Sequence, residues 1–62
     1  MKRRDLIRHL EQHGCYLDRE GSRHTIYHNP QNKRSVAVPR HREIKDTTAR
    51  TICEQIGVPR PA

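Results

Sequence analysis

The chain has 62 residues, a formal net charge of +6 and a hydrophobic fraction of only 31%, with two Tyr and no Phe or Trp. So short a chain buries about 60% of the surface that it exposes when unfolded, which predicts one domain over residues 1–62 with a thin core. The charge favours a polyanion such as nucleic acid as ligand, and the lack of a long apolar run excludes a membrane-spanning segment.

The cysteines and the basic start of the chain suggest a cytoplasmic protein. Residues 1–4 are basic, but no apolar segment follows them as it would in a secretory signal. Cys15 and Cys53 fall at positions expected to be buried, so we interpret both as small hydrophobic residues rather than as a disulfide. The Cys and His residues do not have the spacing of metal ligands, and we therefore expect no metal and no cofactor.

The first predicted element is a helix over residues 2–13. Leu6 and Leu10 lie on one face of it, and Gly14 follows in the position that commonly ends a helix. Cations occupy residues 2–4, where the helix dipole prefers anions, so helix stability does not account for them. Two interpretations stay open: a solvated helix start, or a contact with phosphate.

Three strands should follow, over residues 15–19, 22–28 and 33–38. They are separated by a turn at residues 20–21 and by a loop at residues 29–32, which is rich in turn-forming residues. Such short connections predict an antiparallel meander. The residues expected to face the core are Leu17, Val36 and Val38.

A loop at residues 39–43 leads to a second helix that Asp46 or Thr47 could cap. Gly57 ends this helix, and residues 59–62 form a tail. An apolar stripe at helical spacing consists of Ala49, Ile52, Cys53 and Ile56.

The predicted fold is therefore α+β, in the order α-β-β-β-α. We expect a three-stranded antiparallel sheet with two helices on one face, which is the layout of the double-stranded-RNA-binding domain. The other face of the sheet, or its edge near the first turn and the loop after the third strand, would then carry the function.

The main candidate for chemistry is His24, in the segment Gly21-Ser22-Arg23-His24. Gly21 can take the positive φ of a tight turn, and a histidine beside such a turn is open to solvent and can exchange a proton near neutral pH. If Ile26 points into the core, strand alternation turns His24 inward as well. We expect its place at the very start of the strand to release it. The alternative is a polar residue without function on an exposed strand.

Metal-free RNA cleavage requires a base for the 2′-OH, an acid for the leaving oxygen and cations for the phosphate. His24 is the candidate base, and His41 is a weaker candidate acid that could equally be an exposed loop residue. Tyr27, whose ordinary pKa is about 10, is assigned to packing. The candidate cations for binding substrate and stabilising its charge, together with His41, are Arg23, Lys33, Arg34 and Arg40.

From Arg4 to Val58 the chain resembles the HicA (YcfA-like) mRNA interferase toxins of bacterial HicA–HicB toxin–antitoxin systems. The resemblance rests on the order and spacing of several short pieces. They are Asp5-Leu6-Ile7, Leu10, Gly14, Gly21-Ser22-Arg23-His24, the segment 35–41 (Ser-Val-Ala-Val-Pro-Arg-His), Glu43-Ile44-Lys45 and the segment 52–57 (Ile-Cys-Glu-Gln-Ile-Gly).

The resemblance implies a fold like the double-stranded-RNA-binding domain and a metal-independent endoribonuclease that cleaves mRNA. It also implies that His24, as the histidine of a Gly-Ser-x-His motif, is catalytic, and that a HicB antitoxin covers the cleaving surface. The chain departs from many members by carrying Arg23 where they have His, which leaves an auxiliary role of that position open.

Two other functions compete with this one. A non-catalytic RNA-binding module would grip phosphates with several Lys at the start of the last helix, but residues 45–50 carry little charge. A DNA-binding or purely structural protein is the other alternative, and the predicted strands argue against a helix-turn-helix.

Overall fold

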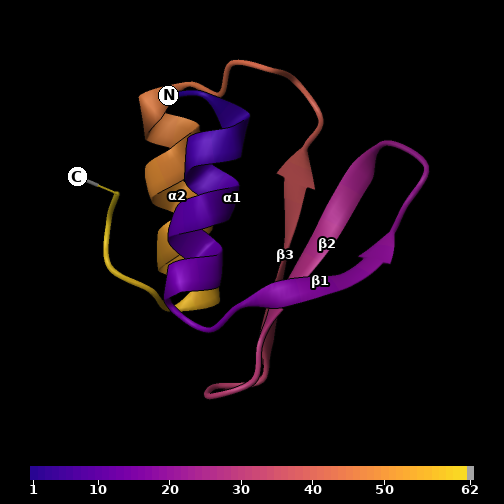
Figure 1. The fold of residues 1–62 in the computed structure, drawn as a ribbon, viewed down its shortest axis with the longest axis vertical. Helices are drawn as coiled ribbons and strands as arrows, with labels where there is room; N and C mark the ends of the chain where they lie inside the picture. Colours follow the sequence, from indigo (N-terminus) through magenta and orange to yellow (C-terminus); the bar gives the residue numbers. More distant parts are fainter. Residues whose placement is uncertain (62) are drawn as a thin grey trace.

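The computed structural model describes residues 1–61 and has the expected order of elements (Figure 1). The predicted boundaries lie within two residues of the observed ones. The elements are α1 (Arg3–Gln12), β1 (Tyr16–Glu20), β2 (His24–Asn29), β3 (Arg34–Pro39) and α2 (Asp46–Ile56).

The three strands form an antiparallel sheet in the order β1-β2-β3. In the β2–β3 hairpin, His24 lies opposite Pro39 at one end, and Asn29 lies opposite Arg34 at the other. The two helices lie side by side on one face of the sheet, as Figure 1 shows. Alternate residues of β2 are buried beneath them, so the opposite face of the sheet stays open.

The core lies between the helices and the sheet. Cys15 and Cys53 belong to it as free thiols, and burial raises the pKa of both. Val36 and Val38 point into it as predicted, together with Tyr27. The further buried hydrophobic residues are Leu6, Leu10, Ile44, Ala49, Ile52, Ile56 and Val58.

The prediction that Leu17 is a core residue was wrong, since its side chain is 48% exposed. Leu17 lies opposite Tyr27 in the edge strand, where a bulge between Leu17 and Arg19 disturbs the pairing. Figure 1 shows β1 running away from the helices, so no helix covers this part of the sheet. A side chain of β1 on the inner face of the sheet, such as Leu17, therefore stays exposed because no helix lies over it.

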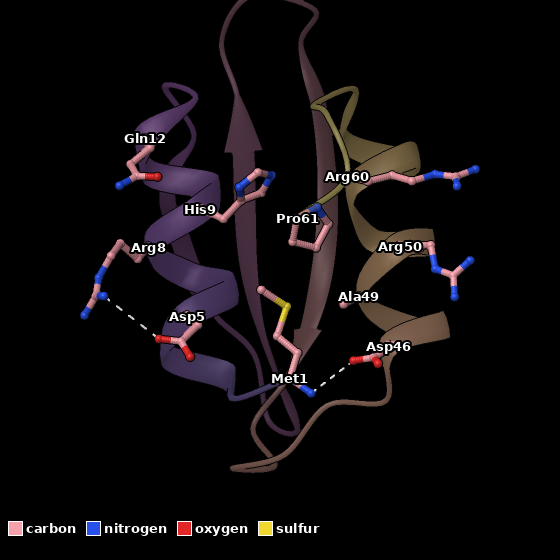
Figure 2. A pocket seen from close by; sticks show the side chains of 10 residues that line it. All are labelled: Met1, Asp5, Arg8, His9, Gln12, Asp46, Ala49, Arg50, Arg60 and Pro61. Atoms are coloured by element: carbon pink, nitrogen blue, oxygen red, sulfur yellow. Dashed lines mark hydrogen bonds and ion pairs between the residues drawn. The ribbon is translucent and has the colours of Figure 1, made fainter.

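The start of α2 also differs from the prediction. Lys45 is the N-cap residue and makes no side-chain capping bond, so neither Asp46 nor Thr47 caps the helix. The Asp46 carboxylate lies in the first turn and accepts a hydrogen bond of 3.2 Å from the amino group of Met1 instead (Figure 2). None of the helices described within residues 1–61 is long and apolar enough to cross a membrane.

The other end of α2 is tied to the β2–β3 turn. Gly57 takes a φ of +77°, which ends the helix. The side-chain amides of Asn29 and Asn32 then both donate to the Ile56 carbonyl, at 2.9 and 3.0 Å. These bonds satisfy a carbonyl that the helix leaves without a partner, and they fix the hairpin against the helix.

The described part of the predicted tail, residues 59–61, folds back toward α1. His9 Nε2 donates a hydrogen bond of 2.7 Å to the Pro59 carbonyl, and Arg60 pairs with Glu54 at 3.6 Å. Residue 62 lies outside the described residues.

Candidate active site

His24 is exposed and is the first residue of β2, as expected. Thr25 and Tyr27 are buried under the helices, whereas Ile26 lies half-buried on the other side. Side chains alternate along a strand, so His24 shares the open face with Ile26. The predicted conflict does not arise, because Tyr27 and not Ile26 is the core residue of this strand. Burial raises the pKa of Tyr27, which agrees with a role in packing.

A hollow of about 390 Å³ lies around His24 where the β1–β2 turn meets the end of β3. It brings the candidate base and the candidate acid to one place, although they are distant in sequence. Its lining residues are Ser22, Arg23, His24, Pro39, Arg40 and His41. Four of the predicted site residues therefore share this hollow.

The turn that precedes His24 is closed by its backbone. The amide of Gly21 donates to the His24 carbonyl at 2.8 Å. A Cβ at residue 21 would lie only 3.0 Å from that oxygen, so a side chain there would push the turn open. Gly21 does not take the positive φ that was predicted for it. Glycine is needed here for close approach and not for a left-handed backbone.

Arg40 holds this turn from the other side of the hollow. Its guanidinium group donates to the carbonyl oxygens of Gly21 and Ser22 and to the carboxylate of Glu20. Its charge is thus paired with an acidic group, which reduces the positive potential that it adds to the hollow. The side chain joins β3 to the β1–β2 turn and fixes the wall beside His24.

A buried hydroxyl links this wall to the first helix. Thr25 Oγ1 accepts a hydrogen bond of 3.0 Å from Arg3 Nη2 and lies 3.3 Å from a carboxylate oxygen of Glu20, to which it can donate. Arg3 Nε donates to the Pro39 carbonyl at 2.8 Å. Arg3 therefore bonds to Thr25, which follows His24 in the chain, and to Pro39, which lies opposite His24 in the sheet. We call the side chains of Arg3, Glu20, Thr25 and Arg40 the turn network.

The sequence prediction missed Arg3 and Glu20, because their partners lie up to 36 positions away in the chain. The only signal was that the three cations at the start of α1 lacked a role in helix stability.

Lys33 and Arg34 do not lie near the hollow. Arg34 stands opposite Asn29, at the far end of the hairpin from His24. The five residue steps from His24 to Asn29 span about 16 Å at the usual rise of a strand. These two cations are on the same sheet as the hollow but cannot join its lining.

The arrangement suits proton transfer next to a phosphate. The imidazoles of His24 and His41 line the hollow. The exposed Arg23 and the hydrogen-bonded Arg40 line it as well. A phosphodiester in the hollow would meet proton acceptors, proton donors and positive charge together. Within residues 1–61, no group of three or more His, Cys, Asp or Glu side chains could hold a metal ion.

Comparison with known proteins gives one match. A family model described as the HicA toxin of bacterial toxin–antitoxin systems matches residues 3–58. A search of curated proteins and a search of solved structures found no match. The family match spans all five elements, including the hollow around His24. The chain therefore belongs to the HicA toxin family of bacterial toxin–antitoxin systems.

Proposed function

We propose that this toxin is a metal-independent endoribonuclease that cleaves mRNA in the cytoplasm with His24 as its catalytic base. The observation that carries the proposal is the meeting of His24, His41 and Arg23 around one open hollow. The toxin family supports a harmful activity, and RNA is the polyanion that the basic chain would meet in the cytoplasm.

In the proposed reaction, the neutral His24 imidazole takes the proton of a ribose 2′-OH. The 2′-oxygen then attacks the adjacent phosphorus, and the bond from phosphorus to the 5′-oxygen of the next nucleotide breaks. His41, in its protonated form, gives a proton to that leaving oxygen. The products are a strand ending in a 2′,3′-cyclic phosphate and a strand beginning with a 5′-OH, so no water is consumed in this step.

Positive charge at the hollow supports the same reaction, because negative charge builds on the phosphoryl oxygens during the attack. Arg23 is exposed on the turn and can reach a phosphate without breaking a contact to an acidic group within residues 1–61. Arg40 is held by Glu20 and by two carbonyls. We therefore propose that Arg23 contacts the phosphate and that Arg40 forms a fixed wall of the hollow.

We further propose that a HicB-type antitoxin neutralises the toxin by covering the open face of the sheet. That face carries His24, and closing it would deny RNA access to the hollow. The chain has 13 Lys and Arg against 7 Asp and Glu, so an acidic antitoxin would complement its overall charge.

The test is cleavage of a defined RNA by the purified protein in excess EDTA. We expect cleavage to persist, and to disappear when the nucleotide before the cut carries 2′-deoxyribose in place of ribose. Cleavage of the deoxy substrate, or loss in EDTA with rescue by a divalent ion, would contradict the mechanism. RNA that is bound and left intact would instead indicate a non-catalytic binding module.

A further inference from the structure

A second hollow, of about 690 Å³, adjoins the first between the start of α1 and the loop after β3. We propose that it is a binding site for the backbone phosphates of RNA next to the cleaved bond, a proposal that rests on RNA being the substrate. We call it the phosphate groove. Its lining residues are Lys2, Arg3, Arg4, Arg40, Arg42 and Glu43.

The charge of the phosphate groove is strongly one-sided, with five cations and one carboxylate. The carboxylate of Glu43 lies 3.6 Å from the amino group of Met1. In contrast, Lys2, Arg4 and Arg42 are exposed and have no acidic group within 4.0 Å among residues 1–61. Exposed cations without acidic neighbours keep their full charge for a ligand.

Backbone pairing holds these cations together although they come from opposite parts of the chain. Lys2 forms an isolated bridge with Glu43, and the amide of Arg3 donates to the Arg42 carbonyl at 2.8 Å. The placement works against the helix, since cations at the N-terminus of α1 meet the positive end of its dipole. The charges of Lys2 and Arg4 therefore lie at a point where the stability of the helix gains nothing from them.

The phosphate groove lies next to the hollow around His24, because Arg40 lines both. The turn network fixes Arg40 between them. An RNA strand with its reacting phosphate beside His24 can therefore lay a neighbouring phosphate against Lys2 and Arg42. Arg and Lys contacts to phosphate position a nucleic acid without reading its sequence.

A second groove of comparable volume lacks these properties. It lies between α1 and α2, has a volume of about 670 Å³, and carries Asp5 and Asp46 among its cations (Figure 2). Arg8 pairs with Asp5 at 4.0 Å, and Arg8 and Arg50 extend away from the groove on either side of it. These two arginines provide a matched control for charge alone.

The experiment measures the affinity for a single-stranded 2′-O-methyl RNA, which lacks a free 2′-OH and stays uncut, at several salt concentrations. The test variant is Lys2→Gln/Arg42→Gln, and the control variant is Arg8→Gln/Arg50→Gln, which loses the same charge. Each lost phosphate contact should reduce the slope of log K against log salt by about 0.7. For two contacts we expect a slope reduced by about 1.4 and about 25-fold weaker binding near 0.1 M salt, with the control close to wild type.

Three results would overturn the proposal: wild-type binding by the test variant, an equal loss in the control variant, or loss of antitoxin binding with RNA binding intact. The test variant should fold normally, because Lys2 makes no side-chain capping bond and the side chains of Lys2 and Arg42 are exposed. Thermal unfolding checks this. Because the RNA is not cut, failure of the phosphate groove and failure of the nuclease proposal are seen in separate assays.

Discussion

Replacing Thr25 with valine tests the turn network most cleanly, because it removes a hydroxyl and keeps the shape of the side chain. Thr25 is 3% exposed, and its Oγ1 lies within hydrogen-bond distance of Arg3 and Glu20. In Thr25→Val, the half-buried Arg3 guanidinium and the exposed Glu20 carboxylate each lose this partner, and the loss costs more at Arg3 because water reaches it less easily. Valine is well suited to a strand, so the change should not disturb the backbone conformation of β2.

The expected loss follows from these contacts. Leaving a buried polar group without its partner costs about 1–3 kcal/mol, and more where the group is charged. Arg3 is only half-buried and Arg40 still pairs with Glu20, so we expect about 2 kcal/mol. In a domain of this size, such a change lowers Tm by about 8–16 °C. RNA cleavage well below Tm should also fall, since β2 begins at His24 beside the altered residue.

The assay is thermal unfolding followed by circular dichroism, with Thr25→Ser as the control. Serine keeps the hydroxyl and loses one methyl group, which is worth about 0.8 kcal/mol. We therefore expect Thr25→Ser to be the more stable variant and to retain more of the cleavage activity. If Thr25→Val unfolds at the same temperature as wild type, or above Thr25→Ser, the network does not hold the turn and the reasoning is refuted.

Three further predictions concern stability. Gly57→Ala should lower Tm by the equivalent of about 2 kcal/mol, because a left-handed φ disfavours alanine and its Cβ would lie 2.2 Å from Asn32 Nδ2; an unchanged Tm would contradict this. Lys33 has a φ of +59°, which glycine adopts more easily than lysine. Lys33→Gly should therefore raise the free energy of unfolding by about 0.5–1 kcal/mol without changing RNA cleavage. A lower Tm would contradict this prediction. Burial raises the pKa of the Cys15 and Cys53 thiols in the folded protein, so as pH rises the unfolded chain loses these protons first. Tm measured in reductant should therefore fall above about pH 8.5. A constant Tm up to about pH 10 would contradict this.

The order of the elements could be predicted because local signals agree with the fold. The apolar spacing of α2 and the glycine that ends it are explicit in the sequence, and both are observed. The inner face of β2 could not be predicted in the same way. Thr25 and Tyr27 alternate with His24 and Ile26, and each pair offers one apolar or aromatic residue to the core. The choice is made by the helices that cover the sheet, through contacts that a strand pattern does not contain.

The candidate site could be predicted in part for a similar reason. His24 and His41 each stand next to a recognisable turn, and the pairing of His24 with Pro39 brings their segments together. Lys33 was grouped with them because it is basic and near a turn, but that turn is at the other end of the hairpin. The roles of Arg3 and Glu20 depend on packing between the first helix and the sheet, which local sequence does not specify.

The rate of RNA cleavage by His24→Ala, compared with His28→Ala, tests the central claim most directly. His28 lies four residues along β2 from His24 on the same open face, where its ring bonds to Ser35 Oγ at 2.8 Å. If His24 is the base, its loss should slow cleavage by a factor of about 10²–10⁴, while His28→Ala stays close to wild type. The account would be contradicted by a folded His24→Ala protein that cleaves RNA at the wild-type rate. It would also be contradicted if the loss of cleavage rate in His24→Ala were no larger than the loss in His28→Ala.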